Sequence, residues 1–125
     1  WTLEVPRIHL LNRVTTALSE TVETELHRYM VVIAWNRGVR LRAFHQESSS
    51  LLLEETRFSS KKTVGKVGIN GQYLQAALES LSGPTVRLRQ PGGRSSLSPL
   101  SGIEITENTE GPGRPAWLIM PVRLE

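Results

Sequence analysis

Residues 69–81 read Ile69-Asn70-Gly71-Gln72-Tyr73-Leu74-Gln75-Ala76-Ala77-Leu78-Glu79-Ser80-Leu81, and they predict a strand that runs directly into a capped helix. Asn70 is a strong N-cap residue, and Ile69 and Leu74 occupy the two positions of a hydrophobic staple. The apolar residues from Leu74 onward follow the spacing of one helical face, and Gly83-Pro84 ends the helix. We therefore expect a strand over Thr63 to Ile69 and then a helix that packs on one side.

The rest of the second half is predicted to be β-structure. Val86 and Leu88 alternate with arginines in a half-buried strand, and Gly92-Gly93 marks a turn. The remaining predictions are a strand over Ser95 to Ile105 with a bulge near Pro99 to Gly102, a polar loop over Glu107 to Pro115, and a closing strand over Ala116 to Leu124.

The first half repeats this order. A short strand over Thr2 to Val5 precedes a helix over Arg7 to Ser19, and Pro6 suits the first helical turn. The helix is expected to bury the face that carries Ile8, Leu11, Val14 and Leu18. An acidic stretch follows, and then strands are predicted over Arg28 to Trp35, Val39 to Ala43 and Leu51 to Phe58, with a hairpin turn at Asn36-Arg37-Gly38.

Each half therefore reads as a strand, a helix and three strands, which indicates an internal duplication. Short sequential strands predict an α+β fold in which the two helices lie on one face of an antiparallel sheet. Four arginines are expected on the side of the strands that their apolar neighbours avoid: Arg40, Arg42, Arg87 and Arg89.

Composition describes one globular domain over residues 1–125. The chain has 38% hydrophobic and 22% charged residues, and its longest apolar run, Met30 to Trp35, is too short to cross a bilayer. A start at Trp1 without methionine suggests a fragment or a processed product, and no signal-peptide pattern is present. The absence of cysteine excludes disulfides and thiolate metal sites. A net charge of +3 is too small to argue alone for a nucleic-acid partner.

Catalytic and metal-binding patterns are missing from the sequence. The histidines, His9, His27 and His45, lack the spacing that places two ligands on one helical face. The glycines around Lys66 have the wrong spacing for a phosphate-binding loop, and no serine lies in a nucleophile elbow. We expect a protein that is not an enzyme and that uses no cofactor and no metal.

The closing residues carry a different signal: they read Ala116-Trp117-Leu118-Ile119-Met120-Pro121-Val122-Arg123-Leu124-Glu125. Proline cannot donate to a central ladder, so Pro121 is expected to mark where the strand leaves the sheet. Met120, Val122 and Leu124 would then lie near the surface beside Arg123, which suits an adaptable peptide-binding surface. An ordinary C-terminal edge strand remains the alternative.

Basic residues are scattered. Arg7 and Arg13 are expected on the exposed side of the first helix, where they would meet phosphates if that helix faced a duplex. A solvated helix face is the alternative, and the second helix offers no cation.

The capped helix and the ending Leu118-Ile119-Met120-Pro121-Val122-Arg123-Leu124 together resemble the C-terminal (third) domain of the bacterial DNA polymerase III β subunit, the sliding clamp. In that family a Phe-Asn-x-x-Tyr-Leu segment opens the last helix and the chain ends in Met-Pro-x-Arg-Leu. Ile69 replaces the usual Phe. The duplicated unit also fits the family's clamp fold over the whole chain, although residues 20–60 align only by pattern.

The resemblance implies a DNA replication processivity factor. Two three-domain subunits would close into a homodimeric ring around duplex DNA, which is held without sequence specificity. DNA polymerase III subunits, the clamp loader and repair polymerases would bind through linear motifs in a cleft between the second and third domains. The cytoplasm, at the nucleoid, is the implied location, with no membrane contact.

The resemblance also assigns residues. The third-domain side of the peptide cleft would comprise Asn70, Tyr73, Ser98, Leu118, Met120, Pro121, Val122 and Arg123. Asn70 has an alternative role as a helix cap only. Ala17 and Leu18 would meet the other subunit. A competing function is a clamp-like domain reused as a ligand-sensing or protein-interaction module of a transcription regulator.

Overall fold

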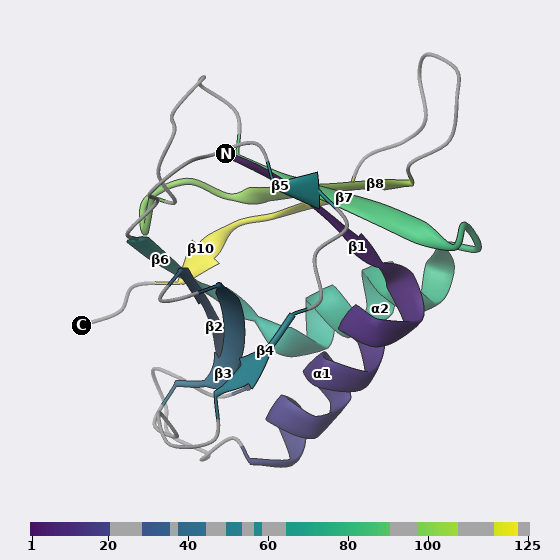
Figure 1. Ribbon diagram of the computed structural model, residues 1–125. Helices are drawn as coiled ribbons and strands as arrows, with labels where there is room; N and C mark the ends of the chain where they lie inside the picture. Colours follow the sequence, from purple (N-terminus) through teal and green to yellow (C-terminus); the bar gives the residue numbers. More distant parts are fainter. Residues whose placement is uncertain are drawn as a thin grey trace.

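The computed structural model describes residues 1–20, 29–35, 38–44, 50–53, 57–58, 65–90, 98–107 and 117–122, and within them it has two helices and two antiparallel sheets (Figure 1). The first half contains β1 (Thr2–Pro6), α1 (Arg7–Ser19), β2 (Met30–Trp35), β3 (Val39–Ala43), β4 (Leu51–Leu52) and β5 (Arg57–Phe58). The second half contains β6 (Gly65–Asn70), α2 (Gly71–Ser80), β7 (Thr85–Arg89), β8 (Ile103–Glu107), β9 (Trp117–Ile119) and β10 (Pro121–Val122).

The strand order confirms the duplication. Sheet A has the order β5-β1-β7-β8-β9 and sheet B the order β10-β6-β2-β3-β4. Adding five to each strand number, and counting past β10 back to β1, converts the first order into the second. The first strand of each half pairs with strands of the other half, β1 with β7 and β6 with β2. The two halves therefore exchange their first strands and share one core.

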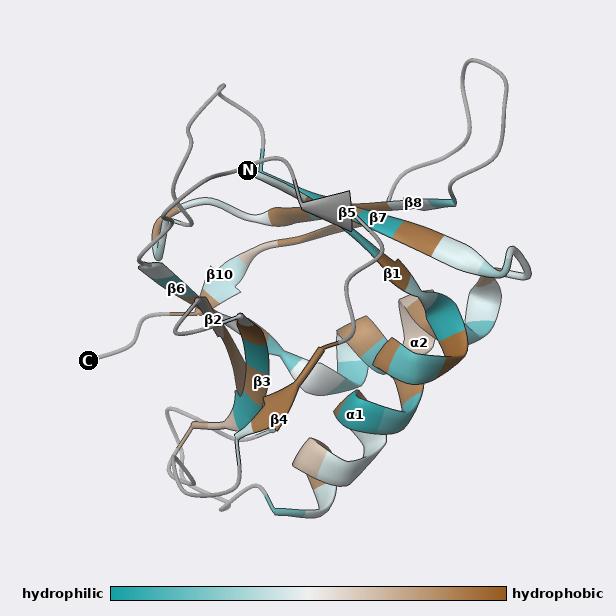
Figure 2. Cartoon of the chain, in the orientation of Figure 1, coloured by the Kyte–Doolittle hydropathy of each residue, from teal (hydrophilic) through white to brown (hydrophobic). Residues whose placement is uncertain are grey.

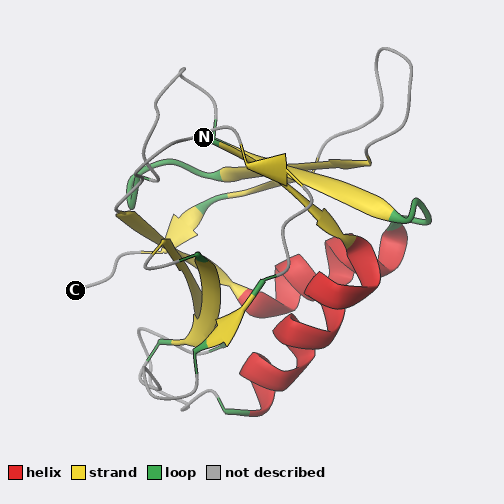
Figure 3. Cartoon of the chain, in the orientation of Figure 1, coloured by secondary structure: helices red, strands yellow, loops and turns green. Residues whose placement is uncertain are grey.

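The α+β class and the antiparallel pairing are confirmed, but the strands form two sheets where the sequence suggested one (Figure 3). The predicted single strands over Leu51 to Phe58 and Ala116 to Leu124 are each split. β4 and β10 belong to sheet B, whereas β5 and β9 belong to sheet A. The chain crosses between sheets in both places, and alternation of apolar residues carries no information about which sheet a strand joins.

The strand predicted over Ser95 to Ile105 is also corrected. Residues 98–102 form a turn, and β8 begins only at Ile103 and continues to Glu107, where a loop was expected. The Glu107 carboxylate joins β8 to the segment that follows α2, since its Oε1 accepts hydrogen bonds from the backbone N–H groups of Ser82 and Gly83 at 2.6 and 3.1 Å.

The two helices lie side by side and contact both sheets, so the core lies between helices and sheets. Figure 2 shows hydrophobic and hydrophilic bands alternating along the helices, as expected for helices that bury one face. α2 buries Leu74, Ala77 and Leu78 as predicted.

The buried face of α1 is rotated from the prediction. Leu10, Val14 and Ala17 are buried, whereas Ile8 is 53% exposed. Leu11 and Leu18 lie at the margin of the core. The sequence offers apolar residues on two overlapping faces of this helix, so their spacing alone did not decide which face is buried. The first turn is joined to the segment between α2 and β7, because the Arg7 N–H donates to the Pro84 carbonyl at 2.9 Å.

Candidate functional site

The β9–β10 junction lies at the beginning of α2. Pro121 pairs with Ile69 and Val122 with Gly68, so Met120, the residue before this ladder, follows at the end of β6 that leads into α2. The strand leaves sheet A just before Pro121, close to where the sequence predicted, and Pro121 then opens β10 at the edge of sheet B, a position at which its missing N–H is tolerated. The closing residues are thus brought to the first turn of α2.

Asn70 organises that first turn. Its Oδ1 accepts hydrogen bonds from the Gln72 and Tyr73 N–H groups at 2.9 and 3.3 Å, which confirms the predicted N-cap. Gly71 donates its N–H to the carbonyl of Tyr29, the residue before β2, at 2.9 Å and so anchors the start of the helix there. The cap fixes the point at which the Tyr73 side chain emerges.

Exposed apolar side chains gather here. Tyr73, Leu118 and Met120 are 62%, 57% and 66% exposed, and Pro121 and Val122 are half-buried. We call these five residues the terminal patch. The elements that carry them are neighbours, since α2 contacts β9 and β10 pairs with β6, the strand that leads into α2, and exposed apolar side chains on neighbouring elements are typical of interaction sites. Arg123, the cation predicted beside it, lies outside the described residues.

Two further apolar residues adjoin the terminal patch and escaped the sequence prediction. Leu100 is 81% exposed on the turn before Gly102, and Trp117 is exposed on β9. Gly102 lies tightly against β9, because a Cβ built on it would be 2.8 Å from the Ile119 carbonyl oxygen and 3.1 Å from Leu118 Cδ1. The predicted bulge near residues 99–102 located this turn, but nothing in the sequence indicated that Leu100 points outward.

Ser98 is not part of this surface. Its residue is buried, its backbone N–H and carbonyl are bonded to the Gln90 side chain at 2.7 Å, and its Oγ accepts from the Leu100 N–H at 3.2 Å. The hydroxyl is therefore occupied inside the turn, which removes Ser98 from the set of surface contacts.

The two arginines assigned to DNA are only half-exposed. Arg7 Nε and Nη1 donate to the Gly83 and Leu78 carbonyls at 3.0 and 3.2 Å, so the guanidinium binds the carbonyl end of α2. Arg13 Nε is enclosed without a hydrogen-bond partner. Among the described residues, the fully exposed side chains of α1 and α2 are uncharged except for Glu79.

The residues assigned to the subunit interface are also partly internal. Ala17 belongs to the buried core, so its side chain is not available at the surface. Leu18 is half-buried, and its Cδ2 would be 2.8 Å from a Cβ on Gly71, which shows how closely the two helices approach there.

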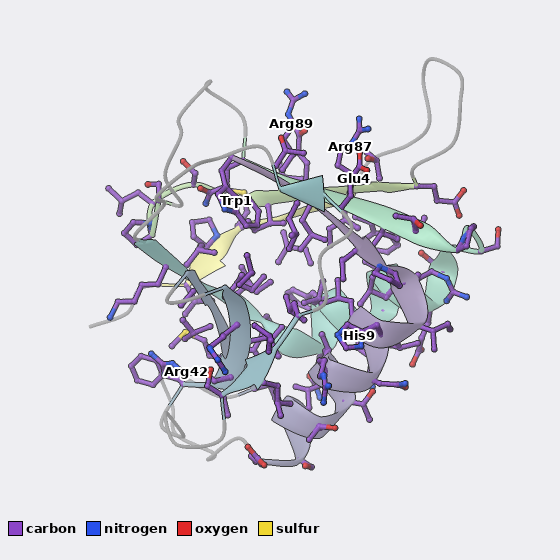
Figure 4. All side chains as sticks on the ribbon, in the orientation of Figure 1. Trp1, Glu4, His9, Arg42, Arg87 and Arg89 are labelled. Atoms are coloured by element: carbon purple, nitrogen blue, oxygen red, sulfur yellow. The ribbon has the colours of Figure 1, made fainter. Side chains whose placement is uncertain are left out.

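Sheet A carries paired charges on its outer side (Figure 4). Glu4 Oε1 accepts from Arg87 Nη2 and Nε at 2.7 and 3.1 Å, and Arg89 Nε lies 3.5 Å from Glu104 Oε2. Both pairs are directly opposite in the ladder, and Glu104 is in turn opposite Leu118. A neutralised ion pair therefore borders the terminal patch on that side.

Within the described ranges, no group of three or more His, Asp or Glu residues is placed to hold a metal ion. None of the helices observed there is long and apolar enough to cross a membrane. His27 and His45 lie outside those ranges.

The duplicated two-sheet domain defines a DNA-clamp type of α+β fold, and comparison with solved structures identifies it. A Thermotoga maritima DNA polymerase III β subunit matches with a TM-score of 0.71 and 11% identity over 98% of this chain. The Caulobacter crescentus pol III β structure matches with a TM-score of 0.64 and 20% identity over 98%. A Pseudomonas aeruginosa sliding clamp bound to griselimycin matches with a TM-score of 0.65 and 17% identity over 98%.

The chain thus has the fold of one domain of a bacterial sliding clamp. It spans 30% of the length of each of these clamps. No protein-family model matches the chain, and no curated protein matches its sequence.

Proposed function

We propose that residues 1–125 are the C-terminal (third) domain of a three-domain sliding clamp, a replication processivity factor that acts by binding and not by catalysis. The terminal patch carries this proposal, because it combines exposed Tyr73, Leu118 and Met120 with the Met-Pro-Val-Arg-Leu ending. Flexible methionine and an amphipathic tyrosine ring suit short apolar peptides of varied sequence. The fold and its coverage of about a third of a clamp chain support the same proposal.

In the complete protein, two subunits would close into a ring around duplex DNA. DNA polymerase III subunits, the clamp loader and repair polymerases would bind the terminal patch through linear motifs, with a preceding domain supplying the rest of the cleft. Arg7 and Arg13 would lie on the DNA side. The hydrogen bonds of the Arg7 guanidinium to the Gly83 and Leu78 carbonyls would limit how far it can reach toward a DNA phosphate. Leu18 would remain as the subunit contact, and the protein would act in the cytoplasm at the nucleoid.

Truncation of Met120 tests the proposed peptide surface. We expect Met120→Ala to weaken binding of a fluorescein-labelled ten-residue peptide that carries a Leu-Phe pair by about tenfold, because a central apolar contact of this kind contributes about 1–2 kcal/mol. Fluorescence anisotropy with the 125-residue chain measures the affinity, and unlabelled griselimycin, a ligand of the Pseudomonas aeruginosa clamp, serves as competitor.

Ile8→Ala is the matched control, because Ile8 is a comparably exposed apolar residue on α1 outside the terminal patch. Equal affinities of the Met120→Ala and Ile8→Ala variants would refute the proposed surface. Absence of any peptide binding by the unsubstituted chain would refute the peptide-binding role itself.

Asn70 variants separate its capping role from peptide binding. Asn70→Ala should lower the free energy of unfolding by about 1 kcal/mol through loss of the cap, whereas Asn70→Asp keeps an acceptor for the Gln72 and Tyr73 N–H groups. If the Asn70 amide also donates to a peptide, Asn70→Asp retains stability in urea denaturation but binds the labelled peptide more weakly. Unchanged affinity of Asn70→Asp would assign Asn70 to capping alone.

A further inference from the structure

We infer that Gln90 is a positioning residue for the peptide surface: buried beneath the turn at residues 98–101, it sets where Leu100 and Leu118 stand relative to each other. The inference rests on the proposed function, because it concerns the same surface. Gln90 directly follows β7 and is 2% exposed, so it cannot touch a peptide itself. Its action must pass through the turn that it holds.

The Gln90 side chain uses both ends of its amide. Nε2 donates to the Ser98 carbonyl at 2.7 Å and to the Ser101 carbonyl at 3.0 Å, and Oε1 accepts from the Ser98 N–H at 2.7 Å. Its backbone N–H donates to the Trp1 carbonyl at 3.1 Å, so Gln90 is itself fixed to the beginning of the chain. One buried side chain therefore replaces the ladder hydrogen bonds that this turn lacks.

The held turn is the one that carries Leu100. Ser98 and Ser101 flank the exposed leucine on either side, and the Leu100 N–H is bonded to Ser98 Oγ at 3.2 Å. The residue after Ser101 is Gly102, whose Cβ position is in contact with Leu118 and the Ile119 carbonyl oxygen. A shift of the turn is therefore transmitted to both Leu100 and the β9 edge of the terminal patch.

Only an amide of this length satisfies the arrangement. Glutamate has nearly the same shape and still accepts from the Ser98 N–H, but it cannot donate to the two carbonyls. The buried Ser98 carbonyl and the partly buried Ser101 carbonyl would then face a carboxylate oxygen, and the turn would have to move away or open to water. Because binding favours a surface that is already ordered, a displaced turn weakens binding without removing any peptide contact.

The test is a double-mutant cycle with Gln90→Glu and Leu100→Ala, measured by anisotropy with the labelled Leu-Phe peptide. We expect each single variant to weaken binding about fivefold. In the Leu100→Ala background, Gln90→Glu should weaken binding by clearly less than fivefold, because the part of its effect that passes through Leu100 is already lost and only the part that passes through the β9 edge remains. A general structural role would lower affinity by the same factor in both backgrounds, and multiplicative effects, or no effect of Gln90→Glu, would overturn the inference.

A second variant and a second measurement complete the test of Gln90. If Gln90→Glu does not fold, Gln90→Asn, which keeps a donor and an acceptor on a shorter side chain, takes its place in the cycle. Amide hydrogen exchange in the free chain gives a readout independent of any peptide: the Leu100 N–H should exchange at least tenfold faster in the Gln90 variant, while the Leu3 N–H in β1 keeps its rate. An unchanged exchange rate of the Leu100 N–H would reject the inference. If instead the unsubstituted chain does not bind the peptide at all, only the proposed function is rejected.

Discussion

Replacement of Gly71 by valine is expected to lower the free energy of unfolding by about 3 kcal/mol. A Cβ at this position would be 2.8 Å from Leu18 Cδ2, 2.9 Å from Val31 Cγ1 and 3.1 Å from the Tyr29 carbonyl oxygen. Side chains of α1 and β2 and a backbone atom close the space on three sides, so the added methyl groups cannot be accommodated by one rotamer change. Circular dichroism during urea denaturation measures the loss.

The control is Ala76→Val, on the exposed side of the same helix. Valine there costs only its weaker helix propensity, about 0.5 kcal/mol. Similar urea midpoints for Gly71→Val and Ala76→Val would show that the helices do not approach as closely at Gly71 as the structure has them. A loss confined to Gly71→Val would show that the start of α2, and with it the terminal patch, depends on the absence of a side chain there.

The sequence predicted α2 well because its signals are local. The Asn70 cap and the apolar spacing after it act within a few residues, and both are realised in the structure. The helix ends at Ser80 with an extended C-cap at Leu81, so it stops before Gly83-Pro84 is reached. The position of β10 beside β6 could not be predicted from local signals. It depends on pairing between Pro121 and Ile69, residues from distant parts of the sequence, and on a change of sheet at Met120 that no local pattern encodes.

The same limit explains the errors in the site. Ser98 and Ala17 were assigned by correspondence of position with a family motif, which does not report burial. Ser98 is enclosed because Gln90 reaches it, and Ala17 because α1 is rotated toward Leu10 and Val14. Exposure of Met120 could be expected from the proline beside it, since a proline restricts the strand to an edge.

The duplication shows why only one half carries the candidate site. α1 begins after Pro6, which supplies no side-chain cap, and its first turn is held by Arg7 against the end of α2. α2 begins after Asn70, whose cap leaves the first turn of the helix open to the surface with Tyr73 exposed. The start of the helix is thus covered by packing in the first half and exposed at the surface in the second half.

Leu74 and Tyr73 are neighbours on α2 that should separate stability from binding completely. Leu74 is fully buried in the core, so Leu74→Ala is expected to lower the free energy of unfolding by about 3 kcal/mol through lost burial and the cavity left behind. Tyr73 points outward, and Tyr73→Ala should change the free energy of unfolding by less than about 0.5 kcal/mol. The same substitution should weaken binding of the labelled peptide about tenfold.

Urea denaturation and peptide anisotropy on both variants give the two quantities. At urea concentrations where Leu74→Ala stays folded, its peptide affinity should lie within about twofold of the unsubstituted chain, because the exposed side chains of the terminal patch are unchanged. A stability loss in Tyr73→Ala as large as that in Leu74→Ala would mean that the tyrosine is part of the core. Stability unchanged in Tyr73→Ala together with unchanged peptide affinity would remove Tyr73 from the binding surface. Since these two side chains leave the same helical turn about 100° apart, one exposed and one buried, the pair tests whether α2 has one face for folding and another for a partner.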